Sequence, residues 1–336
     1  MSQSQAFAVN GNLPMNSSEH YAPWGDNGVK LDHAPTSAEA ITQAGLDWDV
    51  ELRPCTCTAS NGELVTMPNK RMVVRKSDNH PLSVVGSQWT PLQNRDAFSF
   101  FDQFVERGLC EYETAGFINN GEKIWIMAKI KADPLEIIKG DTIDSYFLLT
   151  NVHNATNAGR VLFTNLRLSC LNLLSSLEKR SNQAKIYHMG NITSALKNVA
   201  EICDMRREDF RSTQEQYQFL AYRKASNRRT EEYVDAVLDN GIYKIKDENS
   251  KVQIEESEVK HKRVKKTIYE LIETGRGTEI QGVRGTWWGV MNSCIEYYNY
   301  HQGRTTNTRL NSTFYGVGKK KSQKAIELAL QFANAA

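Results

Sequence analysis

The residues best suited to chemistry lie between positions 151 and 191, where apolar and polar residues alternate as in a β-strand. Most of the polar positions carry a basic side chain or an amide, and no Asp or Glu occurs between Asp144 and Glu178. The solvent-exposed face of a half-buried sheet ordinarily carries both acidic and basic side chains. A face with basic side chains alone is therefore predicted to bind a polyanion. The candidate residues of the segment are Arg160, Arg167, Lys179, Arg180, Lys185 and His188.

Further cations lie on a hairpin predicted from two β-rich runs around residues 71–86, and they are Arg71, Arg75 and Lys76. Several aromatic residues accompany the cations along the chain: Trp89, Trp125, Tyr146, Phe163, Tyr187 and Tyr222. Proteins that bind single strands use cations that follow the phosphates and aromatic rings on which bases stack. We therefore expect a nucleic-acid groove in which Arg160, Arg167 and Lys185 touch phosphates and His188 lies at the rim. Arg167 has a second interpretation, as a structural anchor for a carboxylate.

Motifs for catalysis are weak. The chain has no Walker-type phosphate loop, no dinucleotide fingerprint and no G-x-S-x-G nucleophile motif. The cysteine pair at positions 55 and 57 lacks the second ligand pair of a structural zinc site. Residues 316–320, with the sequence GVGKK, resemble a phosphate loop in composition only and are interpreted as the entry to a helix. We expect no catalytic residue, no metal and no cofactor, although His153 and His188 could meet across adjacent strands.

Composition is that of an ordinary globular protein, with 336 residues and a formal net charge of +2. The six cysteines are too sparse for a disulfide-stapled domain, and the start of the sequence does not resemble a secretion signal. No apolar run approaches the roughly 20 residues that span a bilayer. These features predict a cytoplasmic protein with no membrane partner.

Local patterns predict an α+β fold with a curved, mainly antiparallel sheet, helices on one of its faces, and a helical C-terminal region. We expect a flexible arm over residues 1–35, the α+β core over 36–190, and helices over 191–336 with a charged loop near 241–263. A short helix is predicted at 170–178, and the clearest hairpin is predicted at 111–130 around an Asn-Gly turn. One helix face should be buried through Trp287, Met291, Cys294, Ile295 and Tyr298.

Several blocks, taken in order, resemble the phage/plasmid-related protein family, a domain of unknown function found in phages, plasmids and mobile elements. The blocks are TSAEAITQAGLDWDV (36–50), LSVVGSQWTPLQNRDAFSFFDQF (82–104), GEKIWIMAKI (121–130), YFLLTNVHNATNAGRVLFTNLRLSCLNLL (146–174), IYHMGN (186–191) and GTWWGVMNSCIEYYNYH (285–301). Where family members tend to carry His-Asp-Gly-Ser, this chain carries Asn154 after His153. That difference argues against a metal ligand or a base at position 154.

The family resemblance implies a role in the DNA metabolism of mobile elements, and the predicted order of elements is similar to phage single-strand annealing proteins of the RecT, Redβ and Erf kind. Our principal hypothesis is a non-enzymatic protein that binds or anneals single-stranded DNA in recombination or replication, as a ring or helical homo-oligomer. Two alternatives remain open: a nuclease or nucleic-acid modifier that uses His153 and His188, and an interaction protein that counters a host defence.

Overall fold

A curled antiparallel sheet of eight strands forms the centre of the molecule, and it resembles half of a barrel. The computed structural model describes residues 23–32, 36–175, 184–186, 188, 209–238 and 251–335. The strands run in the order β1-β5-β6-β8-β9-β10, while β7 pairs with β8 and β11 pairs with β9. Their bounds are β1 Gly28–Lys30, β5 Cys110–Ile118, β6 Lys123–Ile130, β7 Leu135–Ile138, β8 Asp141–Val152, β9 Gly159–Arg167, β10 Asn172–Ser175 and β11 Ala184–Ile186.

The hairpin of β5 and β6 turns at the place that the Asn-Gly pair predicts. Asn119 and Asn120 both adopt the left-handed conformation, with φ of 52° and 54°, and Gly121 follows with φ of 96°. Asparagine tolerates this region because its short side chain bonds to nearby backbone, and glycine has no Cβ to clash. The turn is therefore encoded locally, by three residues in a row.

Three short helices cover one face of the sheet: α1 (Ser37–Gln43), α2 (Asn94–Ser99) and α3 (Asp102–Val105). Thr36 caps α1 by accepting a hydrogen bond from the backbone N–H of Glu39. Beneath these helices, Phe101 and Phe104 pack on Phe147 of β8 in one buried cluster.

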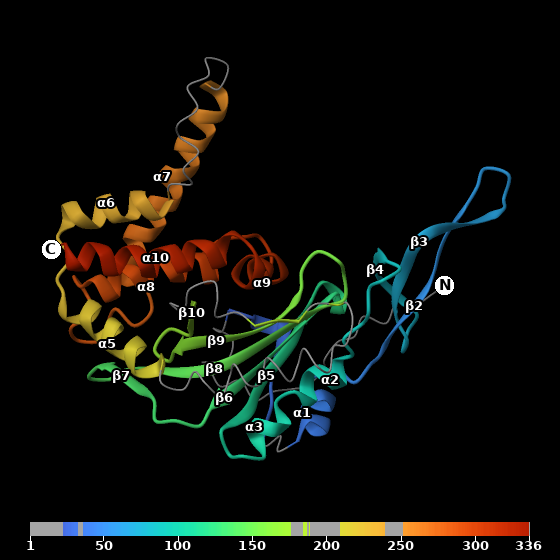
Figure 1. Cartoon of the computed structure of the whole chain (residues 1–336). Helices are drawn as coiled ribbons and strands as arrows, with labels where there is room; N and C mark the ends of the chain where they lie inside the picture. Colours follow the sequence, from blue (N-terminus) through green and yellow to red (C-terminus); the bar gives the residue numbers. More distant parts are fainter. Residues whose placement is uncertain are drawn as a thin grey trace.

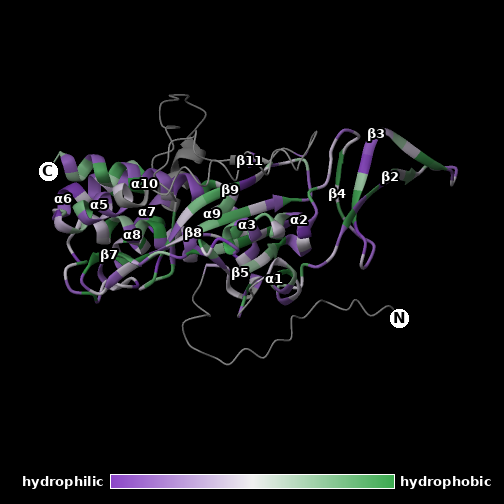
Figure 2. Cartoon of the chain, turned by 60° about the horizontal axis from the view of Figure 1, so that its bottom comes forward, coloured by the Kyte–Doolittle hydropathy of each residue, from purple (hydrophilic) through white to green (hydrophobic). Residues whose placement is uncertain are grey.

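Helix α9 (Thr306–Tyr315) covers the opposite face, where Phe314 packs on Trp125 at 5.8 Å between ring centroids. The sheet is thus enclosed between two helical layers. Figure 2 shows the result, with hydrophobic stretches (green) along the central strands and mixed colouring on the surrounding helices.

The C-terminal helices pack against each other and against the β7 end of the sheet. Besides α9 they are α5 (Asp209–Tyr222), α6 (Asn227–Leu238), α7 (Lys251–Thr274), α8 (Trp287–Glu296) and α10 (Val317–Asn334). All five residues of the predicted apolar face, Trp287, Met291, Cys294, Ile295 and Tyr298, are buried, which confirms that prediction.

Two local predictions are wrong. Residues 251–263 are not a charged loop but the first half of α7, because charged residues such as Lys and Glu are good helix formers. Residues 172–175 form strand β10 in place of the expected short helix, because their backbone pairs with β9 from Asn172 opposite Arg167 to Ser175 opposite Thr164.

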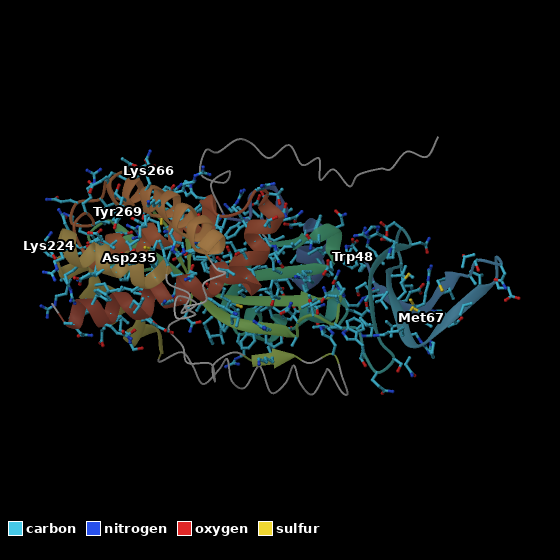
Figure 3. The ribbon with its side chains drawn as sticks, turned by 90° about the horizontal axis from the view of Figure 1, so that it is seen from above. Trp48, Met67, Lys224, Asp235, Lys266 and Tyr269 are labelled. Carbon is cyan, nitrogen blue, oxygen red and sulfur yellow. The ribbon has the colours of Figure 1, made fainter. Side chains whose placement is uncertain are left out.

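A second, three-stranded sheet projects from the body as an arm, formed by β2 (Val50–Thr58), β3 (Leu64–Arg75) and β4 (His80–Gly86). Val73 and Val85 are buried at its base, near Trp48. Its outer part is exposed, with Leu64 at 74% and Met67 at 43% of their accessible surface. Figure 3 shows Met67 far out on this arm and Trp48 where the arm meets the body.

The predicted fold class is confirmed as α+β, with a curled antiparallel sheet and a helical C-terminal region. Among the helices in the described part of the chain, none is long and apolar enough to cross a membrane.

The packing of β1 on β5 leads to a prediction about Gly116. A Cβ placed on Gly116 would lie 1.9 Å from the carbonyl oxygen of Asn27, just before β1. Gly116→Ala should therefore push β1 off the sheet and lower the free energy of unfolding by about 1–3 kcal/mol, measured by denaturant titration. The control is Gly86→Ala, since nothing lies within 4 Å of a Cβ at that position on β4. Equal stabilities of the two variants would contradict this close packing.

Candidate nucleic-acid interface

Two of the predicted phosphate contacts, Arg160 and Lys185, lie directly opposite each other on the adjacent strands β9 and β11. Arg160 is also opposite Thr150 of β8, which is opposite Trp125 of β6. Residues directly opposite in an antiparallel sheet share a face, so all four lie on the face that α9 covers. Arg160 is half-buried and Lys185 is exposed. Like charges in this position destabilise a sheet unless an anion lies between them.

Helix α10 brings a third cation to the same place. Lys319 lies in the first turn of α10, and its pKa is lowered to about 8 by burial and by the positive charge of Arg160. Tyr315, the last residue of α9, lies beside the same group. Burial raises the pKa of Tyr315 to about 12, while Thr150 and Arg160 act in the opposite direction. The sheet and the turn between α9 and α10 therefore meet at a cluster of positive charge.

Lys319 is the residue that the sequence-based prediction missed. Its signal was available, because no Asp or Glu occurs between Glu296 and Glu327, just as none occurs between Asp144 and Glu178. The structure places these two acid-free segments against each other, α9 and α10 on β8 and β9. One lysine of the segment is structural, since Lys321 is buried and donates to the backbone carbonyl oxygens of Val237 and Leu238 at the end of α6.

Arg167 does not belong to this interface, and its expected phosphate contact is wrong. Its side chain is 1% exposed, and its guanidinium donates to both carboxylate oxygens of Asp141, with Nη2 at 2.6 Å from Oδ2. Trp288 donates to the same carboxylate at 2.8 Å, and its ring lies 5.3 Å from the guanidinium carbon of Arg167. Arg167 is thus the structural carboxylate anchor that its second interpretation described.

The hairpin cations lie on β3 and just after it, and no described contact joins them to Arg160 or Lys185. Arg75 donates twice to Asp78, once to the carbonyl oxygen of Asn120, and packs over the ring of Trp48. Arg71 is half-buried and donates to the carbonyl oxygen of Lys70. Lys76 is exposed. Two further predicted contacts, Lys179 and Arg180, lie outside the described residues.

The charge of His188 contributes to lowering the pKa of His153, but the two rings have separate partners, Asn94 for His153 and the backbone carbonyl oxygen of Thr90 for His188. His153 is fully buried, its Nε2 lies 2.9 Å from Oδ1 of Asn94, and burial lowers its pKa to about 3. His188 is 5% exposed and stacks on Trp89 at 4.8 Å between centroids, so it is not at the rim of an open groove. No group of three or more potential metal ligands occurs in the part of the chain that the structure describes.

The aromatic residues expected to stack on bases have a different role. Trp89, Trp125, Tyr146 and Phe163 are each at most 8% exposed and belong to the core or to the base of the arm. Tyr222 is 75% exposed at the end of α5, and Tyr187 lies outside the described residues. Among the residues that the structure describes, the interface therefore offers cations and hydroxyl groups rather than the predicted aromatic platforms.

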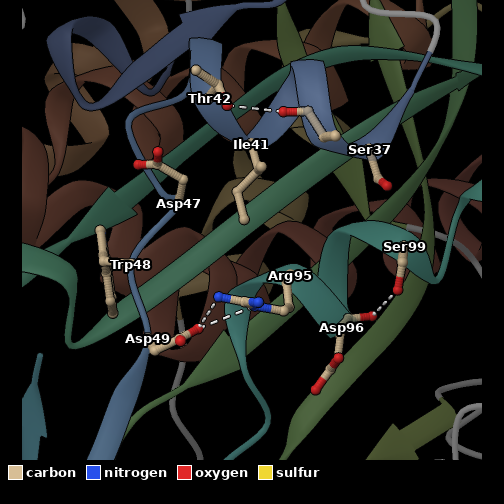
Figure 4. Close-up of a pocket in the computed structure, with 10 residues that line it drawn as sticks. Ser37, Ile41, Thr42, Asp47, Trp48, Asp49, Arg95, Asp96 and Ser99 are labelled. Atoms are coloured by element: carbon tan, nitrogen blue, oxygen red, sulfur yellow. Dashed lines mark hydrogen bonds and ion pairs between the residues drawn. The ribbon is translucent and has the colours of Figure 1, made fainter.

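A hollow of about 390 Å³ opens on the other side of the sheet, between α1 and α2 (Figure 4). Its lining includes Asp47, Asp49 and Asp96, and its one cation, Arg95, bonds to Asp49 at 2.8 Å. Burial raises the pKa of Asp96. An acid-lined hollow repels phosphate, so it is separate in place and in charge from the Arg160–Lys185 row.

The fold and the site define an α+β protein whose curled sheet meets its C-terminal helices at a cationic junction. The chain belongs to the family catalogued as domain of unknown function DUF932, whose model matches residues 81–323. The match runs from β4 to the first turns of α10 and so includes every strand and helix of the junction. No curated protein and no solved structure matches the chain significantly, so no likeness to annealing proteins is shown.

The Arg167–Asp141 pair leads to a prediction on stability. Asp141→Ala would leave a buried guanidinium without its carboxylate, which should lower the free energy of unfolding by about 3–5 kcal/mol. The control is Glu111→Ala, because its pair with Lys131 is half exposed on both sides. That variant should change stability by less than about 1 kcal/mol. A loss below about 1 kcal/mol in Asp141→Ala, by chemical denaturation, would contradict the anchoring role.

His153 leads to a prediction on pH. Its pKa is about 3 in the folded protein and about 6.5 when unfolded, so between these values only the unfolded state takes up the proton. Its contribution to stability is therefore complete above pH 6.5 and is lost as the pH falls, by about 3 kcal/mol at pH 4. His153→Gln should flatten the acid limb of the stability–pH curve by about that amount. An acid limb in His153→Gln as steep as that of the wild type would refute the assignment.

Proposed function

We propose that this protein binds single-stranded nucleic acid by its phosphates, at the junction formed by β9, β11 and the start of α10. The observation that carries the proposal is the meeting of Arg160, Lys185 and Lys319 at one place, where Arg160 and Lys319 come from two facing segments that contain no acid. Charge that is concentrated in this way and left unneutralised attracts a polyanion.

Several basic side chains of the C-terminal helices support this choice because they are neutralised locally. Arg228 pairs with Glu232 on α6, and Lys266 pairs with Glu270 on α7. Lys265 of α7 pairs with Asp235 of α6, and Asp235 is labelled in Figure 3. Cations already paired with carboxylates gain less from a phosphate than unpaired ones do, so the junction is favoured over these helices.

A single strand fits the junction better than a duplex does. Duplexes are commonly read by a helix or a ribbon that enters a groove about 12 Å wide, whereas the cations here form a short row across neighbouring strands. Sites of this kind cover about 4–16 nucleotides. Annealing along a longer strand would require several subunits side by side, and a ring or helical homo-oligomer is part of the proposal.

A second candidate, an interaction protein, is favoured by one observation. The outer part of β3 exposes Leu64, Val65 and Met67, at 74%, 48% and 43%. Exposed apolar residues grouped in this way are typical of protein contact surfaces. Absence of strand binding at low salt would leave this candidate in place of the first.

The test of strand binding is a double substitution at the row, Arg160→Ala with Lys185→Ala. Affinity for single strands of different sequence should fall about equally, because phosphates carry no sequence information. The slope of log affinity against log salt should flatten by about 0.7 for each phosphate interaction that the substitutions remove, measured by fluorescence anisotropy with single- and double-stranded DNA and with RNA. Size measurement with and without the strand, by light scattering, tests the oligomer.

The matched control removes the same charge elsewhere, through Arg228→Ala with Lys266→Ala on α6 and α7. This variant should keep the wild-type affinity and salt slope. If the two double variants lose affinity equally, binding follows net charge alone and the junction is not the site. If the strand is cleaved or modified only when Mg²⁺ is present, the enzyme alternative is favoured.

A further inference from the structure

Four buried polar atoms at the junction have no hydrogen-bond partner outside their own group. They are Nε of Arg160, Nζ of Lys319, the hydroxyl of Tyr315 and Oγ1 of Thr150. They come from four different elements, β9, α10, α9 and β8, so no single local irregularity accounts for them. Buried polar groups in folded proteins are nearly always paired, and a group of four unpaired atoms is unusual.

The four groups lie together. Thr150 and Arg160 are direct partners across β8 and β9. The hydroxyl of Tyr315 is near enough to Thr150 for a hydrogen bond that lowers its pKa, and the charge of Arg160 lowers the pKa of both Tyr315 and Lys319. A fifth group completes the wall, since Nζ of Lys123 lies 4.9 Å from the centre of the Tyr315 ring and donates to Oδ1 of Asn311 at 2.6 Å. The four groups and Lys123 are thus neighbours at the start of α10.

The chemistry of this region is one-sided. Two cations and two hydroxyl groups can donate hydrogen bonds there, and no carboxylate of the described residues pairs with either cation. Buried donors without a partner lower the stability of the fold, and two positive charges side by side lower it further. An acceptor with about two negative charges would remove both costs.

The backbone adds to the same polarity. The N-cap residue of α10, Gly316, has no side chain, and no acidic residue lies in the first turn, so no negative charge opposes the partial positive charge at the start of this 18-residue helix. Gly318 lets the junction close tightly, because a Cβ at that position would lie 3.0 Å from Oγ of Ser312. Its own N–H donates to Ser312 at 2.9 Å, which fixes the turn between the helices.

We propose that Arg160, Lys319, Tyr315 and Thr150 form a binding site for a phosphate dianion, either inorganic phosphate or the terminal phosphate of a nucleic-acid strand. Arg160 and Lys319 balance its two charges, and the hydroxyls of Tyr315 and Thr150 donate to its remaining oxygens. Arginine and lysine are the usual phosphate ligands of proteins. Where the ligand is a strand end, the inference rests on the function proposed above; binding of free phosphate does not depend on it.

The test is thermal unfolding of the full chain with inorganic phosphate against chloride at equal ionic strength. Phosphate at about 100 times its Kd should raise the Tm of the wild type by about 3–6 °C. Lys319→Met should abolish this rise. It should also leave the Tm without phosphate unchanged or higher, because it removes a buried unpaired charge. If Lys319 were purely structural, Lys319→Met would have a lower Tm than the wild type, and phosphate would raise the Tm of neither protein.

The matched control is Lys320→Met, which removes the same charge from the next, exposed residue and should keep the full response. Thr150→Val, of nearly the same shape, should weaken phosphate binding without abolishing it. Absence of a phosphate-specific rise in the wild type, or an equal rise in Lys319→Met, would overturn the site.

A second arm identifies the source of the phosphate. Oligonucleotides with a 5′-phosphate and with a 5′-hydroxyl are compared for binding to the wild type and to Lys319→Met. Preference for the phosphorylated strand, abolished in the variant, assigns the site to strand ends. A phosphate response with no strand binding at all keeps the site and refutes the proposed function, so the two failures can be told apart.

Discussion

The buried ion pair of Arg167 and Asp141 is the interaction on which the arrangement of the molecule depends. Neither side chain is more than 1% exposed, and the pair takes Asp141 from β8, Arg167 from β9 and the indole N–H of Trp288 from α8. The loop before α8 joins it, since Arg167 also donates to the carbonyl oxygen of Gly277. A charge cannot remain buried without its partner, so the sheet and α8 have to be in place together.

From this pair the positions of the later helices follow. The chain leaves α8 through a π-helical turn, Tyr297–His301, in which the Tyr300 hydroxyl donates to the carbonyl oxygens of Cys170 and Leu171 in the turn after β9. The π-helical turn is thereby held against the sheet. Helix α9 then crosses the sheet face over Trp125, and α10 begins beside Arg160. The junction proposed to bind phosphate is thus positioned by the same contacts that stabilise the fold.

Strand β9 carries two arginines with contrasting surroundings. Arg167 lies on the face of Phe163 and meets a carboxylate, whereas Arg160, seven positions earlier and on the opposite face, meets Lys185 and Lys319. Arg167 contributes only to the stability of the fold, whereas the positive charge of Arg160 is not neutralised and can attract a ligand. The same residue type on one strand therefore serves structure at one end and, by our proposal, binding at the other.

Local sequence alone determined the α+β class, the β5–β6 hairpin and the buried face of α8. Each depends on residues a few positions apart, and periodicity and turn chemistry report such neighbours directly. Only the tertiary structure decided which cations are neutralised. Arg167 is paired by the carboxylate of Asp141 on β8, whereas Arg160 meets the cations Lys185 of β11 and Lys319 of α10. The tertiary structure also decided that the aromatic residues near the cations form the core, and that residues 172–175 pair as a strand, since both outcomes depend on contacts distant in sequence.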